Sequence, residues 1–203
     1  MARPRKVSDD EVFRAAGRVM AQVGPSQLKL SDIAAEAGLT SGALVQRFGS
    51  KRELLLTLVS GWSESIGAMF EALRASQDSP LLGLRKYVDG IAQMGDGPGG
   101  VAHHLGWLQL DLGDPAFHAH AQRAARATRQ ELKSLLEEAI GDGELKAGTD
   151  AGKLARTVEV TIGGSLLTWA FHQEGSARQF LRSDVATVLA PYLTTEGRAV
   201  LAR

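Results

Sequence analysis

The chain has 203 residues, of which 44% are apolar and 23% charged, and it contains no cysteine. This is the composition of a folded globular protein, and the missing cysteine excludes disulfides, cysteine-ligated metal centres and thiol nucleophiles. The net charge is zero, but it is unevenly divided: residues 1–52 hold nine Lys or Arg against five Asp or Glu, a net +4, and residues 53–203 carry −4. A basic first quarter on an acidic remainder suggests that one end binds a polyanion.

Helical periodicity dominates the chain, and no stretch shows a convincing strand alternation. Helices are expected over these ranges: 8–23, 31–37, 40–48, 50–75, 80–94, 101–112, 115–140, 150–173 and 176–193. Ser8 is placed to cap the first helix and Gly24-Pro25 to end it, while Gly38 is a natural left-handed end for the second. Ser50 and Glu53 have the spacing of a capping box. The chain is therefore expected to be all-α, with about nine helices, the first three short or of moderate length.

The segment 28–54 carries the strongest signal. Two short helices are joined by Gly38-Leu39-Thr40, and Ile33, Ala34, Ala37 and Leu44 are spaced to pack them at a steep angle. This is the pattern of a helix-turn-helix, whose second helix enters the DNA major groove. The amide of Gln46 suits bidentate pairing with adenine, and Arg47 suits guanine or a phosphate.

The same segment resembles one known family closely. The matching residues are Asp32-Ile33-Ala34, Ala37-Gly38-Leu39-Thr40, Gly42, Leu44, Phe48, Ser50-Lys51 and Leu54. This pattern is similar to that of the tetracycline-repressor (TetR) family of bacterial transcription regulators. The resemblance covers about the first 55 residues, whereas the remainder matches in length and helix count.

The resemblance implies a helix-turn-helix DNA-binding domain over 1–53 and a larger helical ligand-binding and dimerisation domain over 54–203. It also implies a homodimer that binds double-stranded operator DNA and is released by a small-molecule effector. The candidate DNA-binding residues are Lys29, Ser31, Thr40, Ser41, Gly42, Ala43, Val45, Gln46, Arg47 and Lys51. Two of these depart from the family pattern. Val45 stands where the family has a phosphate-binding Tyr, and Lys29 where it often has Thr.

Large apolar side chains in the second part of the chain are candidates for a ligand pocket, together with one histidine. The set is Trp62, Ile66, Met69, Phe70, Met94, His104, Trp107, Leu108, Phe117 and Trp169. For any single member, an ordinary place in the core is the more frequent outcome. Neither His103-His104 nor the His118 and His120 pair has metal-ligand geometry on a helix, so no metal and no other cofactor is expected.

The last two expected helices carry the candidate dimer interface that the resemblance implies: Gly163, Gly164, Leu181, Val185, Val188, Leu189 and Tyr192. Two glycines inside a helix cost about 2 kcal/mol relative to alanine. Close approach of another helix explains that cost, and a kink or a ligand-facing gap explains it equally well.

Three other functions compete with a regulator. An enzyme is disfavoured because the chain has no P-loop, nucleophile elbow or dinucleotide motif. A helical small-molecule binding protein with a weak or vestigial DNA head stays open because of Val45 and Lys29. A nonspecific architectural DNA binder is disfavoured by the neutral net charge. No apolar run approaches the length of about 18 residues that a membrane span needs, and no signal peptide is evident, so we expect a cytoplasmic repressor that does not interact with membranes.

Overall fold

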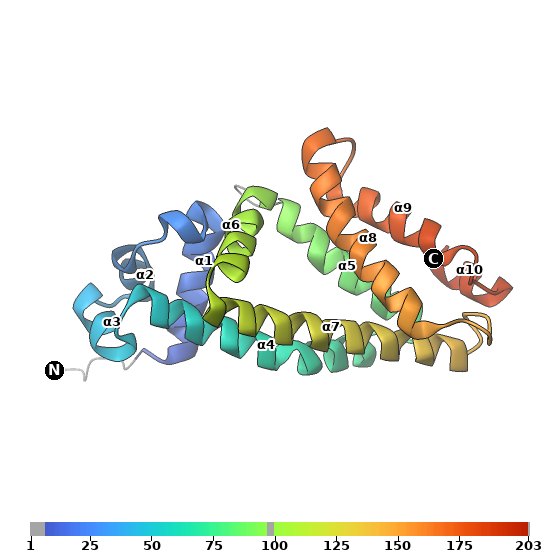
Figure 1. The fold of residues 1–203 in the computed structure, drawn as a ribbon, viewed down its shortest axis with the longest axis horizontal. Coiled ribbons are helices and arrows are strands. Elements are labelled where there is room, and N and C mark those ends of the chain that lie inside the picture. Colours follow the sequence, from blue (N-terminus) through green and yellow to red (C-terminus); the bar gives the residue numbers. More distant parts are fainter. Residues whose placement is uncertain (1–6, 97–99, 203) are drawn as a thin grey trace. The chain divides into compact units, whose positions relative to one another are not determined.

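The computed structural model describes residues 7–96 and 100–202. Within this part of the chain there are ten α-helices and, besides them, one isolated antiparallel bridge between Leu145 and Leu193. The helices are α1 (Asp9–Gln27), α2 (Leu30–Ala37), α3 (Ser41–Phe48), α4 (Lys51–Ala75), α5 (Pro80–Asp96), α6 (Gly100–Gly113), α7 (Pro115–Gly141), α8 (Ala151–His172), α9 (Ala177–Leu189) and α10 (Thr195–Leu201) (Figure 1). The predicted all-α class is confirmed. None of the described helices has the length and apolarity needed to cross a membrane.

Capping explains most of the helix boundaries. Ser8 and Glu11 form a full capping box at the start of α1, and Gly38 ends α2 with a left-handed φ of 69°. At α4 the expected capping box is only half formed. The Ser50 hydroxyl accepts from the Glu53 amide at 3.1 Å, but the Glu53 carboxylate pairs with Arg52 instead of the Ser50 N–H, which donates to the carbonyl of Phe48.

One expected helix end is confirmed and another was wrong. The regular helix at the start of α1 ends at Gly24, whose φ of 72° and ψ of 166° are non-helical, and a short second helical segment continues α1 to Gln27. The last expected helix, 176–193, ends at Leu189, and a separate helix α10 begins after Thr194, whose hydroxyl accepts from the Gly197 amide at 3.1 Å. Pro191 lacks an N–H and Thr194 is a good N-cap, which together favour this break.

The chain folds into two compact units. Unit 1 comprises Met1–Trp62 and Gly97–Ala121, and unit 2 comprises Ser63–Asp96 and Gln122–Arg203. Two of the three boundaries, after residues 62 and 121, fall inside helices, so α4 and α7 each contribute to both units. By packing, α6 therefore groups with the first three helices. The expected division into a DNA-binding domain over 1–53 and a ligand-binding and dimerisation domain over 54–203 stays a prediction.

The core of unit 1 forms where α1, α2, α3 and the start of α4 meet. Val12, Ile33, Leu44 and Leu54 are all fully buried there, and Phe117 at the start of α7 joins the same cluster. Arg18 of α1 pairs with Glu36 of α2 at 2.6 Å on the outside of this core. The amino-terminal helices are thus positioned by apolar packing and held in register by a surface ion pair.

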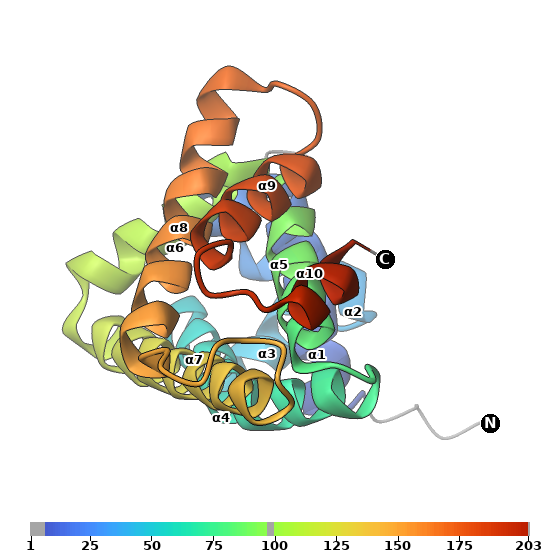
Figure 2. The same ribbon diagram turned by 90° about the vertical axis from the view of Figure 1, so that its right-hand side faces the viewer.

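In unit 2, α9 packs against both α8 and α5 (Figure 2). The fully buried side chains include Phe70, Leu84, Val158 and Leu181, and the Phe70 ring lies 5.0 Å from that of Tyr87. Two polar contacts, one buried and one partly buried, join separate segments of the chain. The carboxylate of Glu144 accepts from the Leu81 amide at 3.1 Å, and Ser165 donates to Asp184 at 2.6 Å.

Candidate nucleic-acid interface and ligand site

The turn between α2 and α3 has the packing that the sequence predicts. Ile33 and Ala34 of α2 and Leu44 of α3 are buried, and Thr40 caps α3 by accepting from the Ala43 amide at 3.1 Å. The Phe48 ring, at the end of α3, lies 5.8 Å from the Phe13 ring of α1. α3 is therefore fixed on its inner side, which orients its outer side as a rigid surface.

The outer side of α3 presents small and polar residues. Thr40, Ser41, Gly42 and Gln46 are exposed, and Ala43 is half-buried. The described part of the chain offers the Gln46 amide no hydrogen-bond partner, so its donor and acceptor both face solvent. Bidentate pairing with a base edge needs such an uncommitted side chain on a rigid helix.

Arg47 lies in the predicted region but is already engaged. One of its guanidinium nitrogens donates to the carbonyl of Val7 at 2.8 Å, another forms an ion pair with Asp9, and the guanidinium carbon lies 5.5 Å from the centre of the Phe48 ring. The side chain therefore ties the end of α3 to the start of α1. In this arrangement Arg47 positions α3, and direct contact with a base requires it to leave Asp9.

Val45 is 47% exposed, although it is apolar. It occupies the position of the family's tyrosine and offers no hydrogen bond to a phosphate. Near it, Lys51 is half-buried, and its ammonium lies 3.5 Å from the carbonyl of Ser26, which is a weak contact. Lys51 can therefore turn towards a phosphate at little cost.

Lys29 and Ser31 lie at the start of α2 and are both exposed. Lys29 is the N-cap residue of α2 and makes no capping bond with its side chain, whereas the Ser31 hydroxyl donates to Asp32 at 3.2 Å. The basic residues Arg3, Arg5 and Lys6 of the first quarter lie outside the described residues, as do residues 97–99.

The ten candidate ligand residues divide between the two units. Trp62, His104, Trp107, Leu108 and Phe117 belong to unit 1, and Ile66, Met69, Phe70, Met94 and Trp169 to unit 2. Phe117 and Trp107 pack in the core of unit 1, which is the ordinary structural role. Trp62, at 57%, and Leu108, at 40%, are exposed within the chain.

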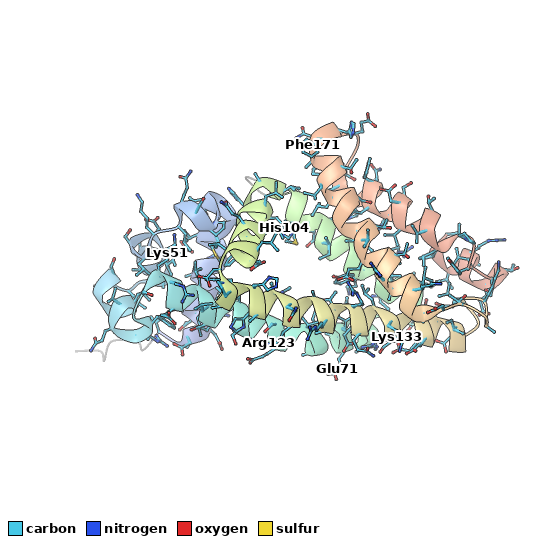
Figure 3. The ribbon with its side chains drawn as sticks, in the orientation of Figure 1. Lys51, Glu71, His104, Arg123, Lys133 and Phe171 are labelled. Carbon is cyan, nitrogen blue, oxygen red and sulfur yellow. The ribbon has the colours of Figure 1, made fainter. Side chains whose placement is uncertain are left out.

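His104 belongs to a small polar group on α6 and the start of α7. Burial lowers the pKa of His104, although the nearby Asp111 carboxylate acts in the opposite direction, and burial also raises the pKa of Asp111. The His118 Nδ1–H donates to the Asp111 carbonyl oxygen over 3.1 Å. No group of three or more possible metal ligands occurs among the described residues. His104 (Figure 3) is therefore a candidate polar contact for a ligand.

Sequence reasoning missed a second polar group, on α5, α7 and α8 in unit 2. Burial raises the pKa of Tyr87 to about 12, with the Glu159 carboxylate acting in the same direction and a hydrogen bond to Thr128 in the opposite one. The Glu159 carboxylate is itself paired with Arg129 at 2.6 Å. Tyr87 gave no signal in the sequence, because its polar partners Thr128 and Glu159 come from two other helices.

The candidate dimer residues split into two classes. Leu181, Val185 and Leu189 of α9 are buried inside unit 2, so they cannot serve as partner contacts as expected. Their apolar stripe faces the subunit's own α5 and α8, because α9 is covered by both. Of the other residues named, Val188 is half-buried, while Tyr192, Gly163 and Gly164 are exposed.

The exposed side of α8 is apolar over several turns. Val160 is 65% and Phe171 86% exposed, and Gly163, Gly164 and the half-buried Leu167 lie between them on the same side of the helix. Figure 3 shows Phe171 at the free end of α8. Nothing in the described part of the chain comes within 4 Å of a Cβ built on either glycine.

Two family models match the chain. The model for bacterial regulatory proteins of the tetR family matches residues 12–58, and the model for the tetracyclin repressor-like C-terminal domain matches residues 108–185. Among curated proteins, the chain is 23% identical over 171 residues to the fatty acid metabolism regulator protein of Bacillus subtilis, covering 81% of this chain and 84% of that protein.

Solved structures show the same fold. A TetR transcription regulator from Haloarcula marismortui is similar with a TM-score of 0.75 and 18% identity, over 92% of this chain and 98% of that one. The transcriptional regulator FadR from Bacillus subtilis, solved in complex with stearoyl-CoA, is similar with a TM-score of 0.67 and 20% identity, over 90% of this chain and 98% of that one.

Proposed function

The chain belongs to the tetR family of bacterial regulatory proteins, and on that premise we propose that it is a cytoplasmic repressor without catalytic activity. It binds a pseudo-palindromic operator as a homodimer and is released by a small, mostly apolar molecule. The observation that carries the proposal is the outer side of α3, where Thr40, Ser41 and Gln46 are exposed on a helix anchored by buried Leu44.

In this proposal α3 enters the major groove and Gln46 pairs with a base, most favourably adenine. Thr40, Ser41 and Lys51 contact phosphates, which positions the helix without specifying sequence. Arg47 holds α3 against the start of α1 through Val7 and Asp9. With Val45 unable to bind a phosphate, Lys51 and Lys29 supply the electrostatic part of the affinity.

The homodimer forms through the exposed apolar side of α8. A glycine inside a helix costs about 1 kcal/mol relative to alanine, and here nothing in the subunit's described residues uses the space above Gly163 or Gly164. A second subunit packed closely on this side explains both glycines and covers Val160 and Phe171. Such a twofold contact is self-complementary, as homodimers require.

The effector is an apolar or amphipathic molecule, and a long-chain acyl-CoA is the first candidate. The Bacillus subtilis relative is a fatty acid metabolism regulator, and its structure holds stearoyl-CoA. In this chain, Ile66 and Phe70 offer buried apolar surface in unit 2, and the Tyr87 hydroxyl with Thr128 offers a polar contact beside it.

Release from the operator requires that ligand binding affects the helix-turn-helix domain. α4 and α7 each run from one unit into the other, and their first turns are tied together where Arg52 of α4 forms a bidentate pair with Asp114, at 2.9 and 3.0 Å. We propose that the effector displaces α6 and thereby α4, which changes the separation of the two α3 helices of the dimer. Both heads then no longer fit successive major grooves.

The proposal is tested by selecting binding sites for the purified chain from a random DNA pool, with the native protein and the Gln46→Ala variant. An enriched inverted repeat, bound about 5- to 150-fold more weakly by Gln46→Ala, is expected because a bidentate base contact is worth about 1–3 kcal/mol. The control is Gln22→Ala, an exposed glutamine on α1. If no sequence is enriched while apolar ligands bind, the chain is a helical small-molecule binding protein with a vestigial head.

A further inference from the structure

Unit 2 contains a cavity of about 370 Å³ that none of the sequence-predicted ligand residues lines. It lies along α5 and α9, with Leu201 of α10 also in its wall. Pockets of about 300–1,000 Å³ are typical of small-molecule sites. The cavity is therefore large enough for a small ligand, and it is a different place from the candidate effector site.

Three contacts fix the two long walls of this cavity. α5 and α9 run antiparallel, since Gly95 lies next to Ala177 at one end while Asp89 pairs with Arg182 further along. The Asp89–Arg182 pair is bidentate, with distances of 2.6 and 2.5 Å. The walls are thus held together before any ligand arrives, which lowers the ordering cost of binding.

The end wall is equally well held. α10 is seated by Gly197, whose Cβ, if present, would come within 2.1 Å of the Glu144 carbonyl oxygen. The Thr194 hydroxyl adds a hydrogen bond of 2.7 Å to the carbonyl of Gly143. Leu201, at the end of this short helix, is therefore a fixed part of the cavity.

The cavity floor is apolar and its wall carries cationic groups. Leu81, Leu84 and Val88 of α5 and Val185 and Leu189 of α9 are each at most 5% exposed, and they form the floor. Burying a ligand's apolar part against this floor is favourable in proportion to the area removed from water.

Two arginines, Arg85 and Arg182, lie in the wall, but their charges are compensated differently. Arg182 is neutralised by Asp89, and this pair raises the pKa of the arginine. Arg85 makes only a long hydrogen bond of 3.4 Å to the Leu201 carbonyl, and within the described part of the chain no carboxylate lies within 4 Å of it. The cavity thus combines an apolar floor with one guanidinium that has no counter-charge among residues 7–96 and 100–202.

We propose that this cavity is a second ligand site, specific for a small amphipathic monocarboxylate such as a medium-chain fatty acid. The carboxylate pairs with Arg85, for which a guanidinium fork is well suited, and the tail lies on the floor. From Leu81 to Val88 the α5 wall spans about 10 Å at 1.5 Å per residue. This length suits a medium chain and is too short for the acyl chain of stearoyl-CoA.

The test is calorimetric titration of the full chain with octanoate and with octanol, which has the same tail length and no charge. Octanoate is expected to bind once per chain. The affinity for octanol is expected to be at least about tenfold lower. Arg85→Met, which keeps an unbranched apolar stem and removes the guanidinium, is expected to weaken octanoate binding by about tenfold or more and to leave octanol binding unchanged. Arg178→Met, on the exposed side of α9 outside the cavity wall, is the matched control.

A second variant, Ala186→Phe, fills the cavity and is expected to abolish binding of both ligands, while the urea unfolding midpoint shows that it is folded. Equal affinity for octanol and octanoate, an unchanged affinity in Arg85→Met, or no binding at all overturns the proposal. Saturating stearoyl-CoA is expected to leave the octanoate titration unchanged. If stearoyl-CoA displaces octanoate and Arg85→Met has no effect, octanoate occupies the effector site. That result overturns the second site but leaves the proposed function standing.

Discussion

The glycine near the end of α1 and the two glycines in the middle of α8 have opposite surroundings. At Gly24 the backbone has a φ of 72°, and a Cβ would lie 2.8 Å from the His103 ring of α6. At Gly163 and Gly164 the backbone is helical, and no neighbouring group among the described residues lies within 4 Å of a Cβ built on either glycine. The first glycine is required by the subunit's own packing, whereas the second pair is not, which directs attention to a partner.

The largest loss of stability is expected from a substitution in the core of unit 1, to which α1 contributes. Leu44→Ala removes a fully buried side chain between α2, α3 and α1 and is expected to lower the free energy of unfolding by about 2–5 kcal/mol. Urea denaturation measures this loss. Leu108→Ala, which truncates a 40% exposed leucine of α6, is the matched control and is expected to change stability by less than about 0.5 kcal/mol.

The same substitution at two glycines of α1 is expected to change stability in opposite directions. Gly24→Ala is expected to cost about 1–3 kcal/mol, because φ 72° with ψ 166° is a conformation that almost only glycine adopts, and because the His103 ring must move. Gly17→Ala, at an exposed helical position with open space, is expected to gain up to about 1 kcal/mol. Thermal unfolding of both variants gives the signs, and equal signs contradict the account.

A smaller effect is expected on α8, where a substitution should stabilise the helix but weaken the dimer. Gly163→Ala is expected to stabilise the isolated helix by up to about 1 kcal/mol and yet to weaken the dimer, because the added methyl separates the two subunits. Sedimentation equilibrium measures the dimer dissociation constant. A variant that is more stable and dimerises as tightly as the native chain would show that the glycine face has no partner.

The smallest effect concerns pH and the polar group on α6. Burial lowers the pKa of His104 below 6.5. As the pH is lowered through this range, the unfolded chain binds more protons than the folded chain, so the folded chain becomes less stable. Asp111, whose pKa is raised above 3.8, acts at lower pH with the opposite sign. His104→Asn is expected to reduce the stability difference between about pH 7 and about pH 5.5, whereas His172→Asn, on an exposed histidine, is not.

The packing of the helix-turn-helix segment was predictable because its determinants are local. Gly38 as a left-handed helix end and Leu44 as a buried contact were both deduced from neighbours within a few residues, and the structure agrees with both. The engagement of Arg47 was not predictable, because its partners Val7 and Asp9 lie some 40 residues away in the sequence.

In the rest of the chain the helices were predictable from the sequence, but what each helix face packs against was not. The stripe Leu181, Val185 and Leu189 was correctly seen as one apolar face, but periodicity does not reveal whether a face meets a partner or the subunit's own core. In the same way, Phe117 and Trp107 look like pocket residues in sequence and belong to the core of unit 1. The cavity at Arg85 depends on antiparallel packing of α5 with α9, which no local pattern encodes.

In the proposed complex, a dimer held through α8 presents two α3 helices to one operator. The direct test is the affinity for the selected inverted repeat and for its half-site, measured at one salt concentration with the native chain and with Gly164→Leu. The native dimer is predicted to prefer the inverted repeat strongly, and Gly164→Leu to be a folded monomer that binds repeat and half-site alike. A native chain without that preference, or a monomeric variant that keeps it, would contradict the claim.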